Sequence, residues 1–375
     1  MRNTTGLGNY SRYALEVMAR GLPHDKLYMC HGAVRVHERL RPLEKYHNLR
    51  HLTPEGLWKH FPALWRQWGV VGSLRAAGVN LYHGLSNEIP SGLDSAGIAS
   101  VVTVHDLIYR RCPEDYAAVD RAMYNLKYAA SARHATRVIA ISECTKRDII
   151  SDFGVPEDRI DVIYQGTDTI FDHIPDGGYT ARVLHGHGLT EPYVLAVGTV
   201  QPRKNQLMAL NAMHELWERG CSHKLVLVGK LAGAYGRKVL DYIRRNRLEN
   251  RVMCRDDISF RDLPALYAGA DVTLYVSRYE GFGLPVAESL RMLTPVVACS
   301  GSCLEEAGGP GAIYVSPDDS SACARAVELL LKDSERNTAM ARAGYDYVKR
   351  FSTDNFFKQT AECYDSALRQ FFNRQ

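Results

Sequence analysis

Short runs of β-branched and other apolar residues alternate with amphipathic stretches along most of the chain. Runs such as Val-Val-Thr-Val and Leu-Val-Leu-Val lack alternating polar positions, which is typical of strands buried on both faces. The apolar runs predict strands at Val79–His83, Ala99–Val104, Arg137–Ile141, Asp161–Tyr164, Tyr193–Gly198, Lys224–Val228, Arg251–Cys254, Asp271–Val276 and Val296–Ala298. The helical windows between them lie at Asp120–His134, Asn205–Arg219, Arg261–Ala268 and Ser320–Leu331. This alternation predicts a doubly wound α/β fold with parallel sheets.

The length of 375 residues fits two such domains. Residues 165–191 are rich in Gly, Asp, His and Pro and show no sustained period, so we expect a linker near 170–190. The sequence thus predicts an N-terminal domain over 1–175 and a second domain over 190–350. The last windows, Thr338–Arg350 and Thr353–Phe372, have no strand between them. We expect the terminal helix, within 353–375, to pack back on the N-terminal domain.

Composition excludes several classes of protein. A net charge of +4 is too small to indicate nucleic-acid binding, and no apolar stretch is long enough to span a membrane. The N-terminus lacks the apolar core of a signal peptide. The nine cysteines are scattered and contain no Cys-x-x-Cys pair, which argues against a disulfide framework or a metal site. We therefore expect a cytoplasmic protein with no metal and no cofactor.

Two glycine-containing segments are candidate phosphate sites. Gly6-Leu7-Gly8 precedes a helix and permits close approach of backbone amides to a phosphate, although a simple helix-capping turn has the same pattern. Gly198-Thr199 ends a buried strand and is followed by Arg203-Lys204 at the start of a helix. This position is the carboxyl edge of a parallel sheet, where ligands bind. The fork of Arg203 and the point charge of Lys204 suit a diphosphate, whereas a solvated cationic pair is the alternative.

Two glutamates flank a third loop. Glu280 precedes Gly281, Phe282, Gly283 and Leu284, and Glu288 lies in the first turn of the following helix. The loop amides and the helix N-terminus predict an anion site. Carboxylates beside such a site are suited to accept hydrogen bonds from ribose or sugar hydroxyls. A purely structural role of Glu288 at the helix N-terminus is the alternative.

Histidines lie at two further strand ends. His105 follows the strand 99–104, and His83 ends the strand 79–83. Both positions are at a carboxyl edge, but a single histidine is also a common structural residue. Earlier in the chain, the segment Arg35–Trp68 combines excess basic charge with three tryptophans. This composition predicts peripheral contact with an anionic membrane or, alternatively, a helix whose aromatic residues pack into the first domain.

Together these segments resemble the retaining glycosyltransferases of family 4, also called group 1, which have the GT-B architecture. Tyr279–Ser289 is similar to the Glu-x7-Glu signature of that family, and Gly198-Thr199 with Arg203–Asn205 to its phosphate-binding segment. Ala140–Ile149 and Val162–Asp168 resemble the end of its first domain, and Leu81–Asn87 resembles the bacterial polysaccharide-type members. The resemblance covers essentially the whole chain.

The resemblance implies two Rossmann-like domains facing across a cleft and a role for each motif. It assigns Arg203 and Lys204 to the donor diphosphate, Glu288 to the ribose, and Glu280 with Gly281–Leu284 to the donor sugar. Gly6 and Gly8 would lie near the phosphates and the acceptor, and His105 near the donor sugar. One departure concerns the start. The family begins with a strand before the glycine loop, and this sequence predicts that the first N-terminal strand is missing.

The resulting hypothesis is a hexosyltransferase that moves a sugar, by resemblance mannose, from a nucleotide-diphosphate donor to a glycan or lipid-linked acceptor with retention. The donor is a substrate, and the resemblance implies no metal. A sugar-nucleotide epimerase and a non-catalytic sugar-nucleotide-binding protein are the alternatives. A nicotinamide dehydrogenase fits less well, because Gly6-x-Gly8 lacks the third glycine of the dinucleotide motif.

Overall fold

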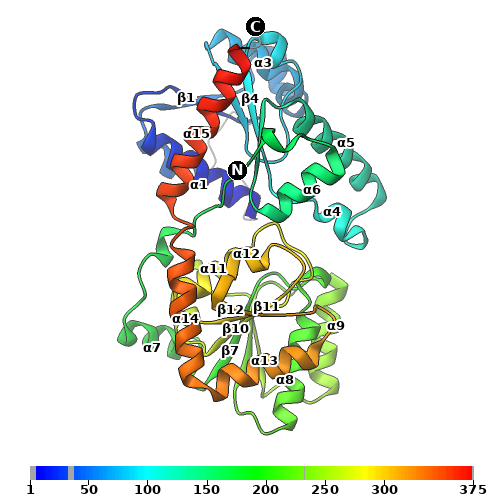
Figure 1. Ribbon diagram of the computed structural model, residues 1–375, viewed down its shortest axis with the longest axis vertical. Coiled ribbons are helices and arrows are strands. Elements are labelled where there is room, and N and C mark those ends of the chain that lie inside the picture. The colour runs from blue at the N-terminus through cyan, green and yellow to red at the C-terminus, as the bar shows by residue number, and fades with distance from the viewer. Residues whose placement is uncertain (1–5, 33–37, 232, 374–375) are drawn as a thin grey trace. The chain divides into compact units, whose positions relative to one another are not determined.

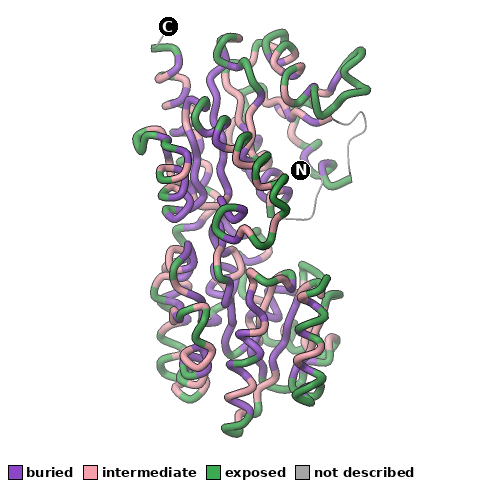
Figure 2. Tube along the Cα trace, turned by 90° about the vertical axis from the view of Figure 1, so that its right-hand side faces the viewer, coloured by how far each residue is buried: buried purple, intermediate pink, exposed green. Residues whose placement is uncertain are grey.

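The computed structural model describes residues 6–32, 38–231 and 233–373, which form two compact units (Figure 1). The first unit comprises residues up to 107, then 117–166 and 353–375, and the second comprises 108–116 and 167–352. Buried residues are concentrated in the central strands of each unit (Figure 2). Each unit therefore has its own core.

The first unit contains two parallel ladders. One has the order β3-β4-β5-β6, and the other pairs β1 with β2. Its strands are β1 Leu27–Cys30, β2 Leu49–Leu52, β3 Leu81–Gly84, β4 Ala99–Val104, β5 Arg137–Ala140 and β6 Ile160–Val162. Its helices are α1 Gly6–Gly21, α2 Pro62–Leu64, α3 Val70–Ala76, α5 Ala118–His134, α6 Glu143–Phe153 and α15 Thr353–Phe372. The terminal helix α15 packs against β4 and α1, and its Phe356 is fully buried.

The second unit is built on one parallel sheet with the order β12-β11-β10-β7-β8-β9. Its strands are β7 Tyr193–Val197, β8 Lys224–Val228, β9 Val252–Arg255, β10 Val272–Tyr275, β11 Val296–Cys299 and β12 Ala312–Val315. Its helices are α4 Ile108–Arg111, α7 Gly177–Gly186, α8 Gln206–Glu218, α9 Gly233–Arg245, α10 Leu263–Ala268, α11 Leu284–Arg291, α12 Leu304–Gly308, α13 Ser320–Lys332 and α14 Ser334–Val348. Helix α8 packs on α13, and α14 on α11 (Figure 1). The doubly wound α/β prediction is confirmed.

Several local elements were not predicted. Strands β1, β2 and β12 were not predicted, because each has only four residues and incomplete burial, which gives no continuous apolar run. The segment expected to be an irregular linker contains helix α7. Asp176 caps this helix by accepting a hydrogen bond from the Tyr179 amide at 2.8 Å. Helix α7 thus begins at a carboxylate cap, although the pattern of hydrophobic residues in this segment does not predict a helix.

Candidate functional site

In the second unit, strand order reverses between β7 and β10, which are adjacent although they are far apart in sequence. In open parallel sheets, ligands bind outside the carboxyl ends of the strands at such a switch point. Gly198 follows β7, and the loop of residues 276–283 follows β10. Two of the three predicted anion-binding segments thus extend from the switch point.

Arg203, Lys204 and Glu280 meet at this edge. Nη1 of Arg203 and Nζ of Lys204 each lie 2.6 Å from the same oxygen, Oε1 of Glu280. The three side chains are largely buried, with exposed fractions of 11%, 14% and 10%. Because two cations share one carboxylate, the cluster carries one net positive charge.

The ionisation of the cluster follows from burial and mutual attraction. Burial opposes ionisation of Glu280, but Lys204 and Arg203 outweigh it and lower the pKa of the carboxyl to about 2. Burial also lowers the pKa of Lys204, and the negative charge of Glu280 opposes that shift. Glu280 is therefore ionised across the physiological range.

Neighbouring groups fix the two cations. Lys204 Nζ donates to the Tyr275 hydroxyl at 2.6 Å and lies 4.8 Å from the centre of that ring. Arg203 Nη1 donates to the Tyr279 carbonyl at 2.6 Å, and the Arg278 amide donates to the Arg203 carbonyl at 2.8 Å. The loop after β7 and the loop after β10 are thereby joined through side chain and backbone.

A buried cysteine forms hydrogen bonds with the backbone of the turn that leads into helix α11. Cys303 is fully buried, and its Sγ donates to the carbonyls of Glu280 at 3.1 Å and Phe282 at 3.0 Å. Gly283 has a φ of +108°, and a Cβ at this position would approach Leu304 Cδ2 to 2.7 Å. Only glycine fits this position, which places Leu284 at the start of α11.

Gly198, which follows β7, and Gly229, which follows β8, lie close to each other. Gly198 has a φ of +146° and Gly229 a φ of +150°, and a Cβ on Gly229 would lie 2.2 Å from the Gly198 carbonyl oxygen. Thr199, the next residue, is exposed, and its carbonyl accepts from Gln206 Nε2 at 3.2 Å. The close approach therefore sets the path of the loop that leads to Arg203.

Glu288 lies in α11 and is 9% exposed. Its Oε2 accepts a hydrogen bond from the Tyr267 hydroxyl at 3.0 Å. Burial raises the pKa of Glu288 to about 7, and the Tyr267 hydrogen bond only partly opposes this. Glu288 therefore titrates near neutrality, unlike Glu280, whose pKa is lowered by Lys204 and Arg203.

In the first unit, His105 is buried at the end of β4. Its Nε2 lies 2.9 Å from the Leu85 carbonyl, and its backbone amide donates to Asn87 Oδ1 at 2.8 Å. Burial lowers the pKa of His105 to about 4, so the ring is neutral at pH 7. Since the Leu85 carbonyl can only accept, the ring proton is assigned to Nε2, and Nδ1 is an acceptor. Tyr10 of α1 packs edge-on against the ring, with centroids 4.5 Å apart.

His83 has a different environment. Its Nδ1 lies 2.7 Å from the Tyr364 hydroxyl and its Nε2 lies 2.8 Å from Thr103 Oγ1, so both nitrogens are engaged. Burial lowers the pKa of this ring to about 3. These contacts favour the structural interpretation of His83.

The glycines near the N-terminus differ from the prediction. Gly6 and Gly8 were expected in a loop, but the structure places both in the first turn of α1. Gly6 is exposed and Gly8 is buried. The residues just before Gly6 lie outside the described part of the chain.

Sequence reasoning missed Tyr275, Tyr267, Cys303 and Gly229, the residues that position the predicted ones. Tyr275 ends β10 immediately before the Glu280 loop, and this position is the signal that could have identified it. Within residues 6–32, 38–231 and 233–373, no three His, Cys, Asp or Glu side chains are grouped as they would be around a metal ion. Over the same residues, no helix has the length and apolarity needed to cross a membrane.

The sequence matches family profiles and characterised proteins. The sequence profile described as "Glycosyl transferases group 1" matches residues 181–347, and that described as "Glycosyltransferase Family 4" matches residues 6–171. O-antigen chain mannosyltransferase B of Escherichia coli is 29% identical over 374 residues, covering 96% of each chain. O-antigen chain mannosyltransferase RfbU of Salmonella typhimurium is 26% identical over 254 residues, covering 68% of this chain and 66% of its own.

Solved structures share the fold. Anabaena HepE in complex with UDP-glucose superposes with a TM-score of 0.76 at 20% identity, covering 98% of this chain and 97% of its own. WaaG, a glycosyltransferase involved in lipopolysaccharide biosynthesis, gives a TM-score of 0.67 at 16% identity, with 96% coverage of both chains. The two matching profiles, the full-length relative and these neighbours agree, and the chain belongs to the family 4, group 1 glycosyltransferases of GT-B architecture.

Proposed function

We propose that the protein transfers mannose from a nucleotide-diphosphate sugar to a glycan or lipid-linked acceptor with retention of configuration. The observation that carries this proposal is the net positive cluster of Arg203, Lys204 and Glu280 at the switch point of the second unit. The relatives described as O-antigen mannosyltransferases support mannose as the sugar and a glycan as the acceptor. The neighbour described with UDP-glucose supports a nucleotide-sugar donor.

The cluster fits the chemistry of a diphosphate leaving group. Breaking the anomeric bond places negative charge on the diphosphate, and positioned cations stabilise this charge more in the transition state than in the ground state. Arg203 and Lys204 supply fixed positive charge with little exposure to water. Glu280 holds both cations in place and lies where the resemblance assigns the donor sugar.

Glu288 and the first-unit residues complete the proposal. A buried carboxylate with one hydroxyl partner has capacity to accept further hydrogen bonds, which suits the ribose hydroxyls. His105, neutral and with an acceptor nitrogen, is proposed to contact the donor sugar, and Gly6 and Gly8 the phosphates and acceptor. Retention follows if the acceptor attacks from the face that the diphosphate leaves, with a phosphate oxygen taking its proton.

The test is a panel of GDP-mannose, UDP-glucose, UDP-galactose and ADP-glucose, each incubated with the protein and a mannose-terminated acceptor. We expect GDP-mannose to be consumed with formation of an α-mannosyl product, whose anomeric configuration NMR would establish. A product of inverted configuration would contradict retention. Altered sugar nucleotide without transfer would identify an epimerase, and nucleotide binding without turnover would identify a binding protein.

The raised pKa of Glu288 gives a prediction about pH. Because the ionised carboxylate accepts ribose hydroxyls, we expect donor affinity to be constant above pH 7 and to fall up to tenfold per unit below it. Replacing Glu288 by Gln should weaken binding and remove this pH dependence, as measured by calorimetry from pH 5.5 to 8.5. An unchanged pH profile in the Gln variant would contradict the assignment.

The same shift affects stability with the opposite sign. A carboxyl whose folded pKa is about 7 binds a proton in the folded state at pH values where the unfolded chain has released it. Its contribution to the free energy of unfolding is therefore full below the unfolded pKa and is lost as pH rises to about 7.

Peripheral membrane contact remains part of the proposal. In the segment 38–68, which is the described part of the basic, tryptophan-rich segment, Leu57, Phe61 and Trp68 are 83%, 56% and 57% exposed. Trp65 is buried instead, so only some of the aromatic residues pack into the first unit. Exposed apolar side chains beside Lys59 and Arg66 suit the interface of an anionic membrane.

We expect the double variant Leu57→Glu, Phe61→Glu to lose about tenfold or more in binding to vesicles that contain phosphatidylglycerol, measured by co-sedimentation. Leu126→Glu is the matched control, because Leu126 is 74% exposed on α5, outside this segment. Membrane contact by this segment would be contradicted if the double variant and the control variant bound these vesicles equally well. It would also be contradicted if the unsubstituted protein bound neutral phosphatidylcholine vesicles as well as it binds those with phosphatidylglycerol.

A further inference from the structure

A chain of hydrogen bonds joins the C-terminal helix α15 to the surroundings of His105 in the first unit. His83 Nδ1 lies 2.7 Å from the Tyr364 hydroxyl of α15, and His83 Nε2 lies 2.8 Å from Thr103 Oγ1. The Tyr10 hydroxyl of α1 lies 3.2 Å from the same Thr103 oxygen. Tyr10 in turn packs edge-on against the His105 ring. Side chains of β3, β4, α1 and α15 thus form one network.

This chain has one more hydrogen than it has contacts. The Tyr10, Thr103 and Tyr364 hydroxyls carry one hydrogen each, and a neutral histidine ring carries one on nitrogen. Burial lowers the pKa of His83 to about 3, so its ring is neutral at pH 7. Among the residues that the structure describes, three contacts join these four groups. One group must therefore keep a hydrogen for which the network has no acceptor.

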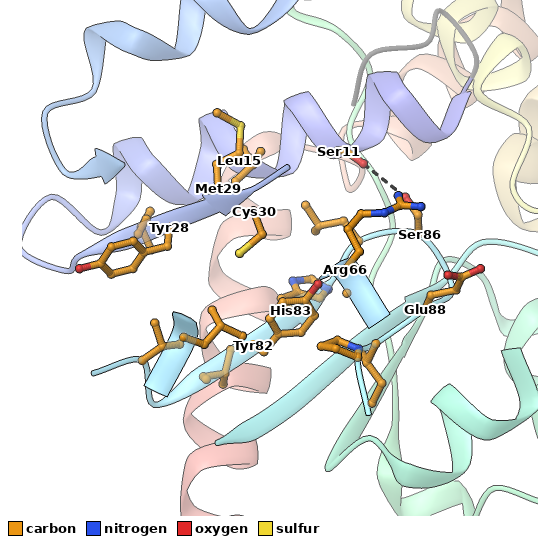
Figure 3. Close-up of a pocket in the computed structure, with 18 of the residues that line it drawn as sticks. Ser11, Leu15, Tyr28, Met29, Cys30, Arg66, Tyr82, His83, Ser86 and Glu88 are labelled. Carbon is orange, nitrogen blue, oxygen red and sulfur yellow. Dashed lines mark hydrogen bonds between the residues drawn. The ribbon is translucent and has the colours of Figure 1, made fainter. Parts of the chain in front are cut away.

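The exposure of the hydroxyl groups decides which of them keeps this hydrogen. Tyr10 and Thr103 are 1% and 0% exposed, and a buried donor without an acceptor is unfavourable. Tyr364 is only half-buried and lines a cavity of about 650 Å³, which His83 also lines (Figure 3). This cavity has room for water to accept a hydrogen bond from Tyr364. The hydrogen without an acceptor in the network therefore belongs to Tyr364.

This assignment fixes the direction of every hydrogen bond in the chain. Tyr10 donates to Thr103, Thr103 donates to His83 Nε2, and the Nδ1–H group of His83 donates to Tyr364. His83 thus carries its hydrogen on Nδ1, whereas His105 carries its hydrogen on Nε2. Without the Tyr364 oxygen, the Nδ1 hydrogen of His83 would lose its acceptor, and the direction of the chain would no longer be determined.

Tyr10 connects the chain to His105. The centroids of these two rings are 4.5 Å apart and their planes are at 88°. Helix α15 also contacts Tyr10 directly, because Phe356 packs edge-on against it at 6.0 Å. The Leu85 carbonyl lies 2.9 Å from His105 Nε2. With its hydroxyl donating to Thr103, Tyr10 keeps one position against His105, and together with Leu85 it sets the orientation of the His105 ring and of Nδ1.

We propose that Tyr364 is a positioning residue for His105 and acts through a directed chain of hydrogen bonds over His83, Thr103 and Tyr10. This role rests on the proposed function, in which His105 contacts the donor sugar. Tyr364 acts through the other groups of the chain and needs no contact with the substrate. The last helix of the protein thereby helps to orient a residue that follows β4.

The test compares Tyr364→Phe with the matched control Tyr46→Phe. Tyr46 is a half-buried tyrosine of the same unit, and its hydroxyl donates to Glu16 Oε1 at 3.2 Å, outside the chain. Nitrogen-15 NMR of the histidine rings reports which nitrogen carries the hydrogen. The signals of His83 and His105 are assigned by their loss in His83→Gln and His105→Gln. In the unsubstituted protein we expect the hydrogen of His83 on Nδ1.

We expect Tyr364→Phe to transfer the His83 hydrogen to Nε2 in part of the molecules and to shift the ring signals of His105. It should lower kcat about tenfold, the scale of changes transmitted through packed contacts, and leave the dissociation constant of GDP unchanged. Tyr46→Phe should change none of these quantities. Thr103→Val breaks the same chain at β4 and should reproduce the effects on His105 and kcat, which tests the proposal independently of the stability of Tyr364→Phe.

Three results would overturn the proposal. They are a His83 hydrogen on Nε2 in the unsubstituted protein, unchanged His105 signals in both Tyr364→Phe and Thr103→Val, and a kcat equal to that of Tyr46→Phe in both variants. If the unsubstituted protein transferred no sugar from any donor, the proposed function would fail instead. The NMR measurements do not depend on turnover and would still test the chain.

Discussion

Replacing Lys204 by Ala is expected to lower turnover by about 10²–10³, the effect of removing one positioned donor from a transition-state oxyanion. The Nζ atom of Lys204 lies 2.6 Å from both Glu280 Oε1 and the Tyr275 hydroxyl. In the proposed mechanism, its removal leaves Arg203 as the remaining side chain of the cluster that stabilises the developing diphosphate charge. Initial rates of donor consumption at saturating acceptor measure this loss.

A surface lysine provides the matched control. Lys332 pairs with Glu328 at 2.6 Å but is 76% exposed at the end of α13, so Lys332→Ala should leave turnover unchanged. The melting temperatures of both variants separate a loss of catalysis from a loss of folding. Near-normal turnover of Lys204→Ala would exclude the proposed role in charge stabilisation.

The substitution Gly229→Ala is expected to lower the free energy of unfolding by about 3 kcal/mol and to weaken donor binding. Its Cβ would lie 2.2 Å from the Gly198 carbonyl oxygen, on a backbone with a φ of +150° that disfavours any side chain. Relief of this contact must displace the loop that carries Arg203. Thermal unfolding and calorimetric titration with nucleoside diphosphate measure the two effects.

The control variant Gly220→Ala separates the effect of backbone strain from that of a steric contact of the new Cβ. Gly220 also has a positive φ, +89°, but a Cβ there meets nothing within 4 Å. We expect it to cost only the strain, about 1–2 kcal/mol, and to leave donor binding intact. Equal losses of stability and equal donor binding in the two alanine variants would show that the close approach of Gly229 to Gly198 does not affect donor binding.

The fold could be predicted where burial is continuous. Strands β4 and β8 have the predicted bounds, because all or nearly all of their residues are buried and the apolar run matches the strand. Strands β1 and β2 could not be found in this way, because each has only four residues and is only partly buried. Their pairing depends on contacts between distant segments, which local periodicity does not report.

The candidate site was predictable in its residue types but not in its contacts. Arg203, Lys204 and Glu280 were identified from loops at strand ends, yet no local pattern indicates that both cations share one oxygen of Glu280. The difference in pKa between Glu280 and Glu288 could not be predicted from the sequence either. It arises from tertiary neighbours, two cations in one case and the Tyr267 hydroxyl in the other.

The position of α15 has a consequence for the order in which the protein can fold as it is synthesised. The first unit contains the beginning of the chain and also its last helix, whose Phe356 is buried and whose Tyr364 hydroxyl lies 2.7 Å from His83 Nδ1. All residues of the second unit have been translated when residue 352 is added. The unit whose translation begins first is therefore completed only after the second unit has been translated, because its core includes residues of α15.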